Sequence, residues 1–225
     1  MSNKIKYLLF DMDGLLTDSE RVTFEIWEDI FREHGYHLTL DFYNSITGMV
    51  DLQIKDIIAE KYPGLDAMKD VYPEWDSRYE ELAPKGGVPL KPGVFELLDY
   101  CDAHGLKKSI VSSNYLHWIE TILKADGVYH RFDHVIDGSL VHHGKPDPEP
   151  FLLSMNEFGA SPEECVVLED SNSGVIAGKR AGMKVICIPD MKQPSEEAIA
   201  YTDVIFSTLL DVIPWLEKQN EEGEI

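Results

Sequence analysis

Six short hydrophobic runs recur along the chain, and glycine, proline or polar residues bound them. They are residues 7–10, 109–111, 134–136, 165–168, 185–188 and 204–206. Apolar runs of this length are typical of strands that are buried on both faces of a parallel sheet. We therefore interpret most of these runs as buried parallel strands.

Amphipathic helices are predicted between the runs. One is expected to begin with Pro92 at its first position, to end at Gly105 and to bury an apolar stripe formed by Val94, Leu97, Leu98 and Cys101. Strands that alternate with helices predict an α/β fold, with a Rossmann-like, doubly wound parallel sheet and right-handed crossovers. Such sheets place their active sites at the carboxyl ends of their strands.

Residues 18–87 break this alternation, because they show helical patterns only. A small α-helical domain inserted after the first strand is the simplest explanation, and the Pro- and Gly-rich residues 83–89 would return the chain to the core. We thus expect a core domain of residues 1–17 and 88–225 and a helical cap domain of residues 18–87. Since the insertion leaves the core beside the end of the first strand, it can act as a lid there.

Composition and charge exclude several classes of function. Hydrophobic residues make up 44% of the 225 residues, yet no apolar stretch approaches the roughly 18 residues that span a membrane. The net charge of -21 opposes binding to nucleic-acid polymers and anionic membranes. The first residues lack the cleavage site of a secretory signal, and Cys101, Cys165 and Cys187 fit buried free thiols. We expect a cytoplasmic protein, a monomer or weak dimer, that acts on a small molecule.

Two carboxylates follow the first run, in the sequence Asp11-Met12-Asp13-Gly14. Carboxylates crowded at the rim of a buried sheet repel each other and resist ionisation, so a cation, a shared proton or a reaction normally accounts for them. An ordinary cap at the end of a strand is the alternative explanation. We favour a magnesium-assisted phosphoryl-transfer site, with Asp11 as the nucleophile and Asp13 as acid and base.

Two further polar groups can hold a phosphate. The second run ends in Ser112, Ser113 and Asn114, which can cap a helix, bind phosphate oxygens, or do both. Lys145 stands between a glycine and a proline, on a loop that the proline stiffens. A fixed ammonium at that position can stabilise a phosphoryl group, although a lone loop lysine is more commonly only solvated.

The fourth run ends in Glu169 and Asp170, again ahead of a predicted helix. Magnesium takes one or two carboxylates together with waters and a substrate phosphate, and Asp170 with Asp11 meets that description. The alternative is that Asp170 only caps the helix.

These groups occur in order along the chain, and together they resemble the haloacid dehalogenase-like hydrolase superfamily. Its four motifs are matched by Asp11-Met12-Asp13-Gly14, by Ser112, by Lys145 in Gly-Lys-Pro-Asp-Pro and by Glu169-Asp170. The insertion resembles the helical cap of the subgroup that contains phosphoglycolate phosphatases, β-phosphoglucomutases and sugar phosphatases. The resemblance covers nearly the whole chain.

The resemblance implies a Mg²⁺-dependent hydrolase for a small phosphate ester, such as a sugar or nucleoside phosphate. Asp11 would form an aspartyl-phosphate, and Asp13 would protonate the leaving alcohol and then activate water. The implied metal-binding residues are Asp11, Asp13 through its main-chain carbonyl, Asp170, and Glu169 as a ligand or outer-shell group. The implied phosphate-binding residues are Ser112, Ser113, Asn114 and Lys145.

Two alternative functions are left open. The β-phosphoglucomutases share the paired aspartates and the cap, but in them an arginine follows the cap glycine, whereas Gly48 here precedes Met49, Val50 and Asp51. The acid in place of that cation argues against a phosphomutase. A noncatalytic metal- and phosphate-binding sensor of the same fold is the second alternative, and the intact aspartate pair counts against it.

Overall fold

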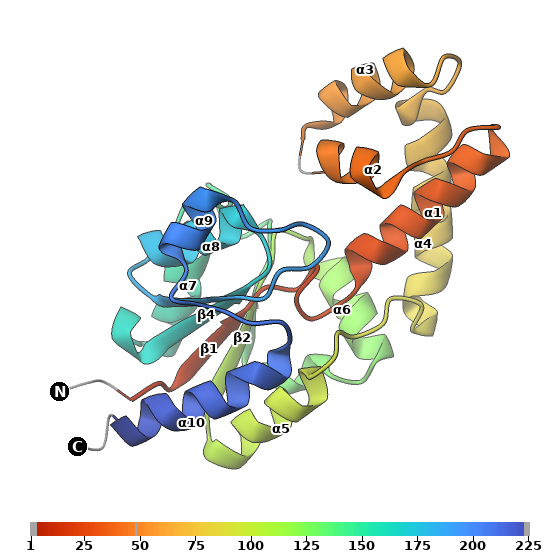
Figure 1. The fold of residues 1–225 in the computed structure, drawn as a ribbon. Helices are drawn as coiled ribbons and strands as arrows, with labels where there is room; N and C mark the ends of the chain where they lie inside the picture. Colours follow the sequence, from red (N-terminus) through yellow and green to blue (C-terminus); the bar gives the residue numbers. More distant parts are fainter. Residues whose placement is uncertain (1–3, 48, 223–225) are drawn as a thin grey trace. The chain divides into compact units, whose positions relative to one another are not determined.

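The structure, a computed structural model, describes residues 4–47 and 49–222 (Figure 1). Gly48, on which the comparison with mutases partly depends, lies outside the described residues. The chain divides into two compact units, one of Met1–Asp18 with Pro89–Ile225 and one of Ser19–Val88. Among the described helices, none combines the length and the apolar character that crossing a bilayer requires.

Six parallel strands form the sheet of the first unit, in the order β3-β2-β1-β4-β5-β6. The strands are β1 Tyr7–Phe10, β2 Lys107–Val111, β3 His134–Ile136, β4 Cys165–Glu169, β5 Lys184–Cys187 and β6 Val204–Ile205. Each lies at one of the six hydrophobic runs. The predicted Rossmann-like α/β core is therefore confirmed.

Helices cover both faces of this sheet. Leu9, Val111 and Val167 pack in one apolar cluster with Phe151 of α7 (Glu149–Phe158) and Val175 of α8 (Asn172–Arg180). Figure 1 shows α5 (Val94–His104) and α10 (Val212–Glu222) on the opposite side of the sheet. Because both faces are covered, every residue of β4 is buried, which explains its uninterrupted apolar sequence. The remaining elements of this unit are α6 Leu116–Ala125, α9 Glu196–Tyr201, and the short turns η3 Tyr129–Arg131, η4 Pro162–Glu164 and η5 Leu209–Asp211.

The order in which the chain adds strands to the sheet reverses at β1. The chain runs outward from β1 through β2 to β3 and then returns to the other side of β1 with β4. Sheets with such a reversal bind ligands beyond the carboxyl ends of the strands that flank it. Asp11, after β1, and Asp170, after β4, lie at these two ends.

The start of α5 differs from the sequence-based prediction. The helix begins at Val94 with Gly93 as its N-cap, so the prediction that Pro92 occupies the first helical position is wrong. Gly93 has a φ of 93°, and a Cβ there would lie 2.7 Å from the backbone nitrogen of Leu210. Both the backbone conformation and the close approach require glycine, and they place the helix start after it. The predicted end at Gly105 is confirmed.

The second unit is helical. It contains α1 Ser19–Glu33, α2 Leu40–Ile46, α3 Asp51–Lys61 and α4 Tyr72–Leu82, with a π-helical turn η1 Ala67–Val71 and a 3-10 turn η2 Ala83–Lys85. Aromatic side chains form much of its interior: the rings of Trp27 and Tyr43 pack edge to face at 5.7 Å, and both are buried. Their burial shows that these two rings stabilise the unit itself.

The three cysteines are free and buried, as the apolar sequence around each predicted. Burial raises the pKa of Cys101, Cys165 and Cys187 to about 12. Thiols with such pKa values carry almost no thiolate at neutral pH, so these side chains act as small apolar packing groups.

His134, at the start of β3, gives the fold a pH-dependent element. Its Nε2 lies 3.0 Å from Ser154 Oγ, and burial lowers the pKa of its imidazole, against the opposing charges of Glu157 and Asp133. Below about pH 6.5 the His134 imidazole takes up a proton more readily in the unfolded chain than in the folded protein. The free energy of unfolding therefore falls as the pH falls. We expect His134→Gln to reduce this loss between pH 7.5 and pH 5 by about 0.5 kcal/mol, a value that allows for partial solvent exposure.

Urea unfolding at the two pH values measures this effect. Equal losses in the wild type and in His134→Gln would contradict the assignment.

Candidate active site

Lys145 connects three strand ends at the rim of the sheet. Its ammonium donates to the Asp11 carboxylate, to Glu169 Oε1 at 2.6 Å and to the main-chain carbonyl of Val111 at 2.8 Å. The side chain is only 5% exposed, and its Nζ lies 5.1 Å from the centre of the Phe151 ring. The sequence predicted a fixed ammonium on this loop, and the structure places it among acceptors from β1, β2 and β4.

Asp11 lies directly after β1, where its backbone nitrogen donates to the Leu168 carbonyl at 3.0 Å. Burial raises the pKa of its carboxyl well above the usual range. The Lys145 charge lowers this pKa, whereas the nearby Glu169 and Asp13 raise it further. Asp11 is thus held in an anionic cluster that one ammonium only partly neutralises.

The carboxylate of Glu169 is completely buried at the end of β4. Its Oε2 accepts hydrogen bonds from the backbone nitrogen and hydroxyl of Ser171, at 3.1 and 2.8 Å. The same hydroxyl caps α8 by accepting from the Gly174 nitrogen at 3.1 Å. Ser171 and Gly174 were not predicted as site residues from the sequence, although a serine two positions and a glycine five positions after a strand-end acid were available signals.

Gly174 leaves room for Glu169, because a Cβ at this position would overlap the Glu169 carboxylate. We expect Gly174→Ala to displace that carboxylate and to lower the free energy of unfolding by about 2 kcal/mol. Urea unfolding measures the change. Gly144→Ala is the control, since no heavy atom lies within 4 Å of its added Cβ, and it should change stability by less than about 0.5 kcal/mol. Equal stabilities of the two variants would contradict this packing argument.

Asp11, Glu169 and Asp170 form a cluster that fits a divalent cation. Each offers a carboxylate oxygen, and these oxygens all lie within 4.8 Å of one another. Hard oxygen donors of this kind suit magnesium. The charge balance also fits, because Lys145 brings one positive charge to three carboxylates, and a cation would offset the remaining charge.

A second group of polar side chains surrounds Asp13. Its Oδ2 accepts from Ser112 Oγ at 3.5 Å and from Asn114 Nδ2 at 3.4 Å, and the Asn114 backbone nitrogen donates to Ser112 Oγ at 3.0 Å. The structure thereby brings the ends of β1 and β2 together around Asp13. Ser113 is exposed, whereas Ser112 is buried and Asn114 is half-buried.

The arrangement can support nucleophilic chemistry. Asp11 is a buried carboxylate with an ammonium in contact, and Asp13 is a separate carboxylate two residues further along the same loop. A nucleophile and a nearby acid or base, with fixed positive charge and hydrogen-bond donors, are the parts that group transfer to an alcohol or water requires.

Several known proteins are similar to this chain. Residues 8–188 match the family model described as haloacid dehalogenase-like hydrolase. A phosphorylated carbohydrates phosphatase of Thermotoga maritima is 32% identical over 80% of this chain and 82% of its own length. Hexitol phosphatase B of Escherichia coli K12 is 28% identical over 91% of this chain and 92% of its own length.

A solved structure also resembles this one. The crystal structure of an HAD family hydrolase from Deinococcus radiodurans R1, with bound phosphate and sodium, superposes with a TM-score of 0.82. It is 25% identical, and the match covers 96% of each chain. The chain belongs to the haloacid dehalogenase-like hydrolase family, in its helical-cap subgroup, and it is a phosphatase.

Proposed function

We propose that the protein is a Mg²⁺-dependent hydrolase of small phosphomonoesters that works through an aspartyl-phosphate on Asp11. The observation that carries the proposal is the contact of the Lys145 ammonium with both Asp11 and Glu169. This contact holds the nucleophile at the carboxyl ends of the central strands, beside the carboxylate of Asp170. The Ser112 hydroxyl and the Asn114 side-chain amide, which both donate to Asp13, complete the site.

In the first step, an Asp11 carboxylate oxygen attacks phosphorus and the bond between phosphorus and the ester oxygen breaks. Asp13 gives its proton to the departing alkoxide, which leaves as an alcohol. In the second step, water attacks the phosphorus of the aspartyl-phosphate while Asp13 takes up its proton. The bond from phosphorus to Asp11 breaks, and inorganic phosphate and the free carboxylate result.

The residues after β2 would bind the phosphoryl oxygens, and Lys145, whose three donors contact Asp11, Glu169 and Val111, would attract these oxygens through its charge. The Lys145 ammonium supplies positive charge where the transferred group concentrates negative charge. Ser112 and Asn114 direct their donors to the same space as Asp13, and the Ser113 backbone nitrogen belongs to that loop. These donors would also orient the Asp13 carboxyl toward the leaving oxygen.

Asp11, Asp170 and the main-chain carbonyl of Asp13 would hold Mg²⁺, with Glu169 as a further ligand or an outer-shell group. The bound ion supplies charge neutralisation and aligns the phosphate with the nucleophile. The two contacts from Lys145 would keep the Asp11 and Glu169 carboxylates in place in this cluster.

The names of two relatives support a proposal for the substrate class. The Thermotoga protein is named a phosphorylated carbohydrates phosphatase, and the Escherichia protein is named a hexitol phosphatase. We infer a sugar or nucleoside phosphate as substrate here, with residues 18–87 as the cap that selects it. We also propose a cytoplasmic enzyme that is a monomer or weak dimer, for which the net charge of -21 favours solubility.

Purified protein with p-nitrophenyl phosphate and a panel of sugar and nucleoside phosphates tests the proposal. We expect Mg²⁺-dependent phosphate release that EDTA abolishes and that added Mg²⁺ restores. NMR of the products separates hydrolysis from a shift of phosphate between two positions of one sugar. Phosphate release that is unaffected by EDTA, or binding of panel members without turnover, would contradict the proposal.

A further inference from the structure

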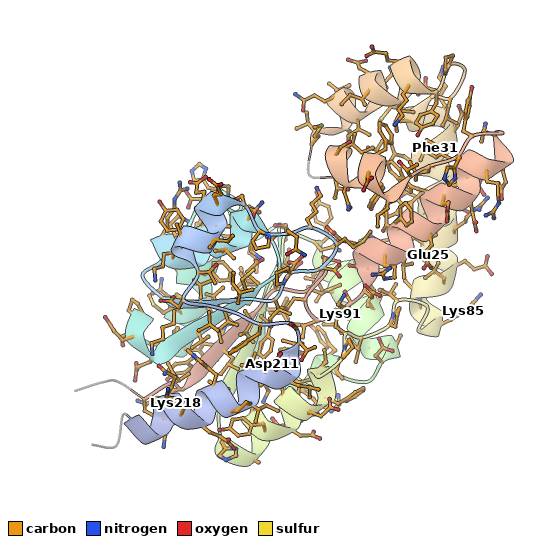
Figure 2. The ribbon with its side chains drawn as sticks, viewed as in Figure 1. Glu25, Phe31, Lys85, Lys91, Asp211 and Lys218 are labelled. Carbon is orange, nitrogen blue, oxygen red and sulfur yellow. The ribbon has the colours of Figure 1, made fainter. Side chains whose placement is uncertain are left out.

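A second cluster of charged side chains lies in the sheet-bearing unit. The ammonium of Lys91, labelled in Figure 2, donates to Asp18 Oδ1 at 3.1 Å and to Asp190 Oδ1 at 2.5 Å. Asp190 follows β5, so it lies at the same end of the parallel sheet as Asp11 and Asp170. Its side chain is only 3% exposed.

The backbone holds Lys91 firmly at this position. Asp18 donates its backbone nitrogen to the Pro89 carbonyl at 2.8 Å, and Lys91 donates its own to the Leu16 carbonyl at 2.9 Å. Thr17 and Leu90 form an antiparallel bridge between these two hydrogen bonds. The segment that returns from residues 19–88 is therefore paired with the loop that begins at the proposed nucleophile.

The second oxygen of Asp190 is the unusual feature of this cluster. Asp190 Oδ2 is buried and has no hydrogen-bond partner. It lies 3.4 Å from the point that a Cβ on Gly14 would occupy, and Asp170 Cγ lies 2.9 Å from the same point. The two carboxylates thus share the space over Gly14. A buried carboxylate oxygen without a partner is costly, and an ordered water or an ion is the usual explanation.

We propose that Asp190 is an outer-shell anion of the metal site. Its Oδ2 accepts a hydrogen bond from a water in the coordination shell of the cation that Asp170 holds, while Lys91 fixes its other oxygen. Magnesium normally keeps several waters when it binds to protein, and outer-shell partners typically change metal affinity by about 10- to 100-fold. The inference rests on the proposed function, since it assigns Asp190 as a positioning residue for the same ion.

Calorimetric titration of the metal-free protein with Mg²⁺, without any substrate, tests this role directly. We expect Asp190→Asn to raise the Kd for Mg²⁺ by about tenfold. The increase in Tm that Mg²⁺ produces should shrink in parallel. Asp133→Asn is the matched control: it breaks an ion pair with Lys107, which lies at the start of β2 and hence at the other end of the sheet, and it should leave the Kd unchanged. An Asp190→Asn protein with the wild-type Kd would overturn the proposal.

The double variant Lys91→Met/Asp190→Asn covers the case in which Asp190→Asn alone does not fold. It removes both charges of the Lys91–Asp190 pair, so no ammonium is left facing the lost Asp190 carboxylate. Weak Mg²⁺ binding in a folded double variant supports the outer-shell role, whereas wild-type affinity would mean that Asp190 only balances Lys91 and would overturn it. Wild-type protein that binds Mg²⁺ but releases no phosphate would defeat the proposed hydrolysis alone, because the titrations of the variants still decide the role of Asp190.

Discussion

Replacing Asp11 by asparagine is expected to reduce phosphate release by at least about 10⁴-fold while the protein stays folded. An amide oxygen is a poor nucleophile, so the first covalent step is lost. Stability should not fall in the metal-free protein. Burial raises the pKa of Asp11, which means that the ionised carboxyl disfavours folding at neutral pH, and asparagine removes that charge.

Steady-state assays and urea unfolding of the same preparation separate these two effects. Asp133→Asn is the control: it breaks an ion pair with Lys107 at the other end of the sheet, and it should retain wild-type activity. The stabilisation by Mg²⁺ should also be smaller in Asp11→Asn, because a proposed ligand has lost its charge. An Asp11→Asn protein that keeps more than a few per cent of the activity would rule out Asp11 as the nucleophile.

Lys145→Met is expected to have the largest effect on stability. Methionine keeps most of the length of the side chain but removes the ammonium, which leaves Glu169 and Asp11 buried without their counter-charge. Breaking a buried pair in this way costs about 3 to 5 kcal/mol. Phosphate release should fall by about 10²- to 10³-fold as well, because the fixed positive charge that would stabilise the transferred phosphoryl group is lost.

Urea unfolding with and without Mg²⁺ measures the loss. We expect added Mg²⁺ to recover part of the lost stability, because it brings positive charge to the same carboxylates. Lys107→Met is the control: its ammonium also pairs with a carboxylate, but the side chain is 58% exposed, and the variant should be nearly as stable as the wild type. A Lys145→Met protein as stable as the wild type would contradict the assigned role of this ammonium.

The central strands β1, β2, β4 and β5 could be predicted from the sequence because burial leaves a direct trace in it. Each hydrophobic run became a strand, and Glu169 marks the carboxyl end of β4. Helix α2 left no such trace: it has only seven residues, and its start depends on Thr39, whose hydroxyl accepts from the Phe42 nitrogen. The start of α5 was also mispredicted, because the contact of Gly93 with Leu210 joins positions far apart in the chain.

The candidate site also contains residues that the sequence could predict and residues that it could not. Parallel strands bring their carboxyl ends to one edge, so residues that follow β1, β2 and β4 could be expected to lie together. Asp190 escaped prediction because a lone aspartate after β5 has no motif, and only the structure reveals its contact with Lys91 and its unpartnered oxygen. Ser171 and Gly174 were missed for a related reason, since their roles depend on where the Glu169 side chain points.

The most direct test of the central claim is to locate the covalent phosphate. Protein mixed with a phosphate ester and Mg²⁺, quenched in acid within one turnover and digested, can be analysed by mass spectrometry. We predict one phosphoryl group on the peptide that contains Asp11, assigned to Asp11 by fragmentation and absent from Asp11→Asn. A phosphoryl group on any other residue, or rapid hydrolysis with no phosphoprotein at any quench time, would contradict the account.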